Sequence, residues 1–311
     1  EPRRKDGERG PEPRRKDGER GPEPRRKDGE RGPEPRRKDG GSILGVKPGV
    51  DDMSPPHAFA VTAATGATVT AAKEWARRLG APLSLGAAGK GHGGLVLEVG
   101  PAGLALLAPG GARVVAAVAE LLAPTRPGRD LLARAALSRT PGGAPSVVDA
   151  TAGLGADGFH LASLGHPVVM LERESLLGAL LEDAIARAMA GQFGRAAADS
   201  ARRVTLHVTD ARDYLAAGEP AGIVYLDPMF PEASKAALPN KGMATLRAHL
   251  EHGTGAAAGE EAELLEAARA FARRRVVVKR PLRAGALGGQ EPSGSLRGRT
   301  VRYDLYAPAP G

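Results

Sequence analysis

From residue 146 onward the chain alternates short apolar, β-prone runs with helical patterns. The runs are SVVDAT (146–151), HPVVMLER (166–173), RVTLHVTD (203–210), GIVYLDP (222–228) and RVVVKRP (275–281). Helical sequences such as DGFHLASLG and ESLLGALLEDAIARAMA follow the first two runs. Strands that alternate with helices form a parallel sheet, because each helix returns the chain across the sheet. The pattern predicts a Rossmann-like α/β domain over residues 146–311, with a late antiparallel strand (300–308) at its edge.

A different pattern precedes this domain. HAFAVTAAT, from His57, predicts a strand, and TVTAAKEWARRLG predicts an amphipathic helix that ends at Gly80. GGLVLEVGPAGLALLAP predicts a hairpin that turns at residues 100–103. We therefore expect a small α+β unit at residues 57–115. A helical connector should follow at residues 116–145, with its first helix in RVVAAVAELLA (113–123).

The chain opens with a repeat. The unit EPRRKDGERGP occurs three times over residues 1–33 and begins again at Glu34. Each unit has two prolines and two glycines and no large apolar side chain, so it has no surface to bury. We predict that residues 1–41 are disordered and that residues 42–56 form a Gly/Pro/Asp linker. A basic arm that contacts phosphates is the functional alternative for the repeat.

Composition restricts the remaining possibilities. Without cysteine the chain has no disulfide, thiolate metal site or cysteine nucleophile, and its seven histidines show no metal-ligand spacing. No apolar run reaches the roughly 18 residues that cross a bilayer. We predict no metal and no membrane association, and a cytoplasmic location with an organelle as the alternative. Half of the net charge of +8 lies in residues 1–40, so the folded part is mildly basic, which is compatible with an RNA partner.

Acidic residues close four successive strands of the predicted sheet. They are Asp149, Glu172, Asp210 (after Thr209) and Asp227. The carboxyl ends of parallel strands meet at one edge, where open α/β sheets bind ligands. Random surface charge would be spread over both ends of the sheet. The clustering therefore predicts a nucleoside-binding edge.

A glycine-rich turn lies between the first strand and its helix. Gly153, Gly155 and Gly158 match G-x-G-x-x-G, which lets the backbone approach a ligand closely. Glu172, about twenty residues later, is placed to accept hydrogen bonds from ribose hydroxyls. Two nucleoside ligands fit this pattern. A nicotinamide dinucleotide would put phosphates on the turn, whereas S-adenosylmethionine would direct its cationic end at Asp149.

The sequence DPMFP (227–231) favours the second ligand. It is close to the Asp/Asn-Pro-Pro-aromatic signature of methyltransferases that act on exocyclic amines. An amine conjugated with a base is a poor nucleophile. Acceptors at Asp227 and at the Pro228 carbonyl would bind its two N–H groups and free the lone pair for attack on a methyl group. Phe230 would stack on the base.

Four segments together resemble one family. VVDATAGLGADGFHLASLG, VVMLERE, VYLDPMFP and RRVVVKRP, in this order and spacing, are similar to the ribosomal RNA small subunit methyltransferase J family. The resemblance is strong over residues 147–281 and absent from the repeat. It implies a class I methyltransferase that uses S-adenosylmethionine to methylate N2 of a guanosine in 16S rRNA, free or in the small ribosomal subunit. It also implies cofactor contacts at Ala156, Asp157, Glu172, Arg173, Thr209, Asp210 and Asp227.

Two departures from the family pattern leave alternatives open. Ala156 stands where the family usually has arginine, and APTRPGRDLLARAA (123–136) replaces a His-Arg-Arg and glycine-rich stretch. The alternatives are a methyltransferase for another exocyclic amine, in DNA or protein, a nucleotide-dependent oxidoreductase, and an inactive RNA-binding relative. Lys279 and Arg280 end the fifth strand, where they would either contact RNA phosphate or solvate the strand end.

Overall fold

The computed structural model describes residues 59–84, 94–109, 111–116, 118, 130–137, 143–228 and 258–310. The chain divides into two compact units, residues 1–41 and 42–311, and every described residue belongs to the second. The predicted repeat, the predicted linker and Phe230 lie outside the described residues.

The larger sheet has seven strands in the order β11-β12-β10-β9-β6-β7-β8. Strands β6 to β10 are parallel and β12 is antiparallel to β10, as predicted. Their order reverses at β6, which lies between β7 and β9, and an open α/β sheet binds its ligand beside such a reversal. The strands are β6 (Val147–Asp149), β7 (Val168–Glu172), β8 (Val204–Val208), β9 (Ile223–Leu226), β10 (Arg275–Pro281), β11 (Gly294–Arg297) and β12 (Val301–Tyr306).

The late strand is antiparallel, but the prediction that it forms the edge is wrong. Strand β11 pairs with β12 on its outer side, with Arg297 opposite Arg302. The sequence of β11 is GSLR, and three of its four residues are exposed. A strand that buries almost no apolar surface has no alternating pattern by which it could be recognised.

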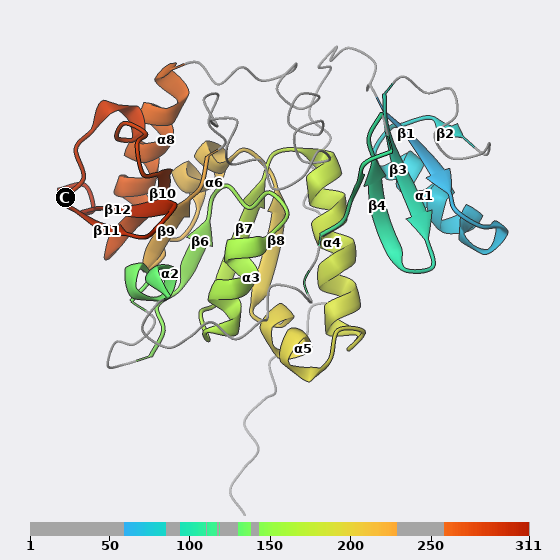
Figure 1. Ribbon diagram of the computed structural model, residues 1–311, viewed down its shortest axis with the longest axis horizontal. Helices are drawn as coiled ribbons and strands as arrows, with labels where there is room; N and C mark the ends of the chain where they lie inside the picture. Colours follow the sequence, from blue (N-terminus) through green and yellow to red (C-terminus); the bar gives the residue numbers. More distant parts are fainter. Residues whose placement is uncertain are drawn as a thin grey trace, which may run out of the picture. The chain divides into compact units, whose positions relative to one another are not determined.

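Helices cover both faces of this sheet (Figure 1). Alternate strand residues point to opposite faces. Val147, Tyr225 and Val277 pack in one apolar cluster with α3, α4 and α5, whereas Val148 and Val224 pack in a second cluster with α6 and α8. The helices are α2 (Leu131–Ala135), α3 (Ala156–Ser163), α4 (Ser175–Met189), α5 (Arg195–Ala201), α6 (Ala211–Ala217), α8 (Ala258–Phe271) and the short 3₁₀ helix η3 (Leu287–Gly289).

A second sheet precedes the first in sequence and has the order β2-β1-β3-β4-β5. The predicted hairpin is confirmed, since Gly100 pairs with Gly103. The predicted helix from residue 113 is wrong at its start, because Arg113 and Val114 pair with β4 and Val114 is buried. Burial in a sheet here overrides a helical pattern. The elements are β1 (Phe59–Ala63), η1 (Gly66–Thr68), α1 (Val69–Arg78), β2 (Leu83–Ser84), β3 (Leu95–Gly100), β4 (Gly103–Leu107) and β5 (Arg113–Val114).

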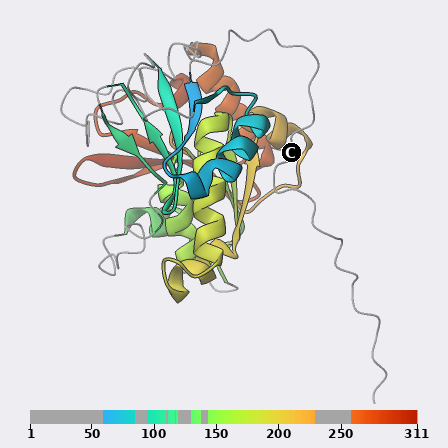
Figure 2. The same cartoon turned by 90° about the vertical axis from the view of Figure 1, so that its right-hand side faces the viewer.

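Helix α4 contacts both sheets. It packs on β7 and β8 and also on β4 (Figures 1 and 2). Nine of its fifteen residues are buried. The backbone N–H of Leu104 donates to Asp183 Oδ2 over 3.0 Å, and Arg78 forms a 2.6 Å ion pair with Glu182. Gly103 has a φ of +99°, and a Cβ there would also approach Asp183 and Arg187, so glycine is favoured at this position. Residues of both sheets share one apolar core.

Candidate functional site

The glycine-rich turn after β6 brings α3 close to the sheet. Gly153 and Gly155 have φ values of +56° and +82°, in the region that favours glycine. A Cβ on Gly155 would lie 2.6 Å from Leu181 Cδ2, and one on Gly158 would lie 2.9 Å from Asp149 Oδ2. Both positions therefore favour glycine, which has no side chain, and this allows the N-terminus of α3 to lie beside the strand ends.

Glu172 connects the end of β7 to this turn. Its carboxylate accepts the backbone N–H of Gly153 at 2.7 Å and that of Glu174 at 2.9 Å. Burial raises the pKa of Glu172 to about 7, despite both hydrogen bonds. The side chain therefore changes charge near neutral pH, and it fixes the turn beside it.

Asp149 lies at the centre of a group of carboxylates. It is 1% exposed and accepts the N–H of Thr151 at 3.3 Å. Burial, followed by the charges of Asp157, Asp227 and Glu172, raises the pKa of Asp149 well above its usual value. These three neighbours act on Asp149 because they lie at the same edge, so the electrostatic potential here favours a cation.

Asp227 reaches the same turn from β9. Its backbone N–H donates to Thr151 Oγ1 over 2.6 Å, which places the start of DPMFP directly beside the segment after β6. Lys279 Nζ lies 3.0 Å from Asp227 Oδ2 and 2.7 Å from Asp157 Oδ2. Tyr225 also donates its hydroxyl to Asp157 Oδ2, over 2.5 Å. The structure thus brings Asp227, Asp157 and Asp149 together.

The expectation that Lys279 and Arg280 solvate the strand end needs correction. Lys279 lies within 3.0 Å of two carboxylates, and Arg280 is 5% exposed. This role of Lys279 was not predicted from the sequence. One signal was available: strand alternation puts residue 279 on the same face as Val277, towards α3.

The other predicted residues lie around this group. Thr209 donates its N–H to the carbonyl of Glu172 at 2.9 Å. Asp210 caps α6, and hydrogen bonds from Arg212 lower the pKa of Asp210. Arg173 lies 3.7 Å from Glu260, and Ala156 is exposed in the first turn of α3. Asp210 is therefore paired with Arg212 and is not among the carboxylates that raise the pKa of Asp149.

Comparison with known proteins identifies the family. A family model described as "Putative SAM-dependent methyltransferase" matches residues 123–308. Ribosomal RNA small subunit methyltransferase J from Pseudomonas paraeruginosa is 41% identical over 245 residues, covering 76% of this chain and 89% of that protein. The chain belongs to the ribosomal RNA small subunit methyltransferase J family. The relative from Stutzerimonas stutzeri is 40% identical over 242 residues, covering 76% of this chain and 90% of its own.

A solved structure shows the same methyltransferase fold. The crystal structure of a SAM-dependent methyltransferase from Neisseria gonorrhoeae has a TM-score of 0.62 and 30% sequence identity, and the match covers 80% of this chain and 95% of that one. The expected Rossmann-like class I methyltransferase fold, the enzyme class and S-adenosylmethionine as cofactor are confirmed.

The cluster of carboxylates in this methyltransferase J relative fits S-adenosylmethionine. S-adenosylmethionine carries a sulfonium and an ammonium, and Asp149, Asp157 and Asp227 offer compensating charge. A nicotinamide dinucleotide would instead bring two phosphates to an acidic edge. Among the described residues no cluster of histidine, aspartate and glutamate side chains is arranged to hold a metal ion, and no helix is both long and apolar enough to cross a membrane.

Proposed function

We propose that this protein transfers a methyl group from S-adenosylmethionine to the exocyclic N2 of a guanosine in 16S rRNA, free or within the small ribosomal subunit. The observation that carries the proposal is the position of Asp227. Its N–H is bonded to Thr151, beside the glycine-rich turn, and its carboxylate belongs to the acidic group at the strand ends. The names of the relatives, ribosomal RNA small subunit methyltransferase J, supply the substrate class.

The proposed amine site uses Asp227, Pro228 and Phe230. The Asp227 carboxylate and the Pro228 carbonyl accept the two N–H groups of the guanine amine, which localises its lone pair for in-line attack. Proline fixes the backbone so that its carbonyl keeps one direction. Phe230 stacks on the base. The proton that the amine loses after transfer leaves through Asp227 or through water.

The proposed cofactor site lies at the strand ends around β6. S-adenosylmethionine supplies an electrophilic methyl group on its sulfonium. Glu172 accepts ribose hydroxyls with the lone pairs that its two backbone hydrogen bonds leave available, and Asp149 faces the cationic end. The contacts proposed for the cofactor are Asp149, Gly153, Gly155, Ala156, Asp157, Glu172, Arg173, Thr209, Asp210 and Asp227.

Exposed arginines beside this edge support an RNA substrate. Arg283 follows β10, Arg297 ends β11, and Arg299 lies in the turn between β11 and β12. The register places all three at the carboxyl end of β10, since Pro281 pairs with Val301. All three are exposed, and no ion pair joins them to a carboxylate in the described part of the chain. Such arginines contact phosphates well.

Methyl transfer to defined acceptors tests the proposal. The purified protein, with labelled S-adenosylmethionine, is offered 16S rRNA, small ribosomal subunits, duplex DNA and a mixture of proteins. Label in N2-methylguanosine of rRNA is expected, and Asp227→Ala should lower its rate by at least about 100-fold. Transfer only to DNA or protein would point to the other exocyclic-amine alternatives. An absence of transfer together with RNA binding would support an inactive relative.

The site of modification and the cofactor need separate measurements. Guanosine methylation in rRNA from cells that lack the gene should be missing at one position and restored by the wild-type chain, but not by Asp227→Ala. Calorimetry should show binding of S-adenosylhomocysteine and none of NAD. Tight binding of NAD alone would contradict the proposed cofactor site.

A further inference from the structure

Lys279 bridges two carboxylates that come from different elements. Its Nζ lies 2.7 Å from Asp157 Oδ2, on the cofactor-side helix α3, and 3.0 Å from Asp227 Oδ2, at the start of the proposed amine site. Its side chain is 25% exposed, and those of Asp157 and Asp227 are 22% and 35% exposed. The ammonium of Lys279 thus links the proposed cofactor site to the proposed amine site.

The register of the sheet places this lysine. Val277 lies opposite Tyr225 and Val278 opposite Leu226, so Lys279 comes next to Asp227 where the two parallel strands end. On its other side Lys279 pairs directly with Tyr303 of β12. The strands on both sides therefore fix the backbone position from which the Lys279 side chain extends.

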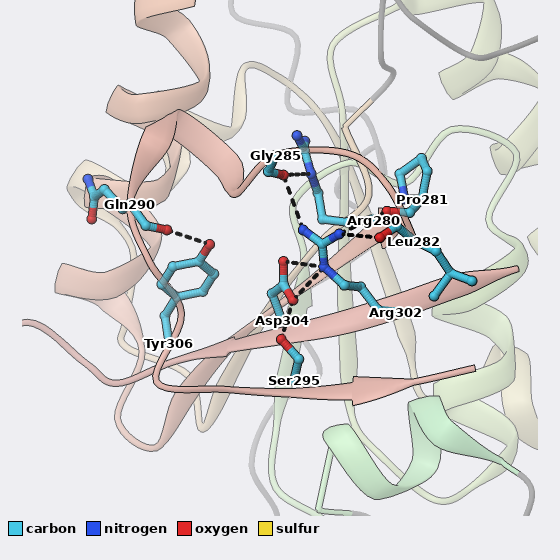
Figure 3. A network of polar contacts seen from close by, with 9 residues as sticks. All are labelled: Arg280, Pro281, Leu282, Gly285, Gln290, Ser295, Arg302, Asp304 and Tyr306. Atoms are coloured by element: carbon cyan, nitrogen blue, oxygen red, sulfur yellow. Dashed lines mark hydrogen bonds and ion pairs between the residues drawn. The ribbon is translucent and has the colours of Figure 1, made fainter. Parts of the chain in front are cut away.

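The end of β10 is itself held in place. Arg302 donates to the carbonyls of Pro281 and Leu282 at 3.1 and 3.0 Å and to that of Gly285 at 3.2 Å (Figure 3). The buried carboxylate of Asp304 accepts its Nε at 2.9 Å. This network fixes the segment that follows Lys279, so the lysine is presented from a rigid strand end.

We propose that Lys279 is a positioning residue for methyl transfer: it holds the Asp227 carboxylate, ionised and correctly directed, against the cofactor helix through Asp157. The inference rests on the proposed function, because it assigns Asp227 to the amine. Lys279 itself touches neither the amine nor the methyl group. Its role goes beyond the two expectations from sequence, phosphate contact and solvation.

Charge explains why a cation is needed at this point. Asp157 and Asp227 share one ammonium and face Asp149, Tyr225 and Tyr303. Two carboxylates that share a site cannot both ionise easily. Asp149 already has a raised pKa from burial and from its acidic neighbours. Removing Lys279 would therefore favour the protonated form of Asp227, and a protonated carboxyl is a poorer acceptor for the amine.

The experiment compares four proteins: wild type, Lys279→Met, Lys279→Arg, and Lys279→Met combined with Asp157→Asn. Rates of methyl transfer to rRNA are measured from about pH 6 to about pH 9, together with KM for both substrates. In Lys279→Met we expect the acid limb of kcat to move upward by about 1 to 3 pH units, the usual effect of losing a neighbouring opposite charge. KM for S-adenosylmethionine should change less than kcat.

The other two variants test the cause. Lys279→Arg keeps the charge, so its acid limb should stay within about half a unit of wild type, even if kcat falls. The double variant removes the second carboxylate as well, so its acid limb should return towards wild type. An unchanged pH profile in Lys279→Met, with a lower rate that follows only the loss of folded protein, would overturn the proposal. If Lys279→Met does not fold, a shifted acid limb in Lys279→Arg would overturn it equally.

A readout without turnover separates this inference from the proposed function. ¹³C NMR of carboxyl-labelled aspartate, assigned with Asp227→Asn, follows the ionisation of Asp227 directly. Its titration should move to higher pH in Lys279→Met, whether or not rRNA is the true acceptor. A wild-type protein that transfers no methyl group to rRNA contradicts the proposed function only. If Asp227 titrates at the same pH in wild type and in Lys279→Met, the positioning role is contradicted.

Discussion

The backbone N–H of Gly153 donates a hydrogen bond to Oε2 of Glu172 over 2.7 Å. This contact joins the turn after β6 to the end of β7. The carboxylate proposed to receive the ribose therefore also determines the shape of the turn that borders it. Because burial raises the pKa of Glu172 to about 7, a single proton affects both properties.

Cofactor affinity should depend on pH through Glu172. Ribose hydroxyls donate to the ionised form, so affinity for S-adenosylhomocysteine should rise as pH increases through about 7 and then level off. We expect binding to be roughly tenfold weaker at about pH 6 than at about pH 8. Calorimetry measures this, and Glu172→Gln should remove that part of the pH dependence. An equally steep dependence in Glu172→Gln would assign the effect to another group.

The same group should make folding stability depend on pH. The folded pKa of about 7 lies above the usual 4.5, so the folded protein binds the proton more tightly than the unfolded chain. The destabilising contribution is absent below about pH 4.5, grows between 4.5 and 7, and is complete above 7, reaching about 3 kcal/mol. Urea unfolding of wild type and Glu172→Gln across this range should show their difference in free energy changing by that amount.

Gly155→Ala should destabilise the protein through two separable effects. Its φ of +82° costs a residue with a Cβ about 1 to 2 kcal/mol, and contact with Leu181 adds about 1 to 3 kcal/mol. Gly165→Ala is the matched control, because Gly165 also has a positive φ of +97° but open space around it. Urea unfolding should give the larger loss for Gly155→Ala. Equal losses would mean that Leu181 moves aside without cost.

Asp304→Asn should destabilise the fold strongly. Asp304 is fully buried, and its loss would leave the guanidinium of Arg302 buried without its carboxylate (Figure 3). Breaking such a pair costs about 3 to 5 kcal/mol. Asp199→Asn breaks the exposed 2.7 Å pair with Arg202 and should cost under about 1 kcal/mol. Thermal and urea unfolding compare the two. A small loss for Asp304→Asn would contradict the role of this network.

The exposed arginines should act on RNA binding rather than on chemistry. Replacing Arg283, Arg297 and Arg299 together with glutamine should raise KM for RNA and leave kcat almost unchanged. If all three contact phosphates, the slope of log affinity against log salt should fall by about 2 to 3. The control replaces Arg273 and Arg274, exposed at the opposite end of β10. An equal effect of the control would indicate unspecific electrostatic attraction.

Much of the sheet could be predicted from sequence because its central strands are apolar and separated by helical patterns. Strand β11 could not, since it buries almost nothing, and Val114 joins a strand because of packing that its neighbours in sequence do not encode. Three of the four strand-terminal acids, Asp149, Glu172 and Asp227, do lie near one another at the carboxyl edge of the sheet. Partners that are distant in sequence depend on register and on where helices lie, so the pairing of Lys279 with Asp157 was not predictable.

Helix α4 couples the two sheets mechanically, because it packs against both of them. On one side, Asp183 of the helix accepts the N–H of Leu104 and lies against Gly103. On the other side, Leu181 of the same helix packs against Gly155 in the glycine-rich turn. A substitution in α4 therefore affects its packing against both sheets. A fragment that lacks the smaller sheet would expose the apolar side of α4 to water. Anyone who shortens or recombines this protein should carry residues 59–116 along with the sheet that holds the site.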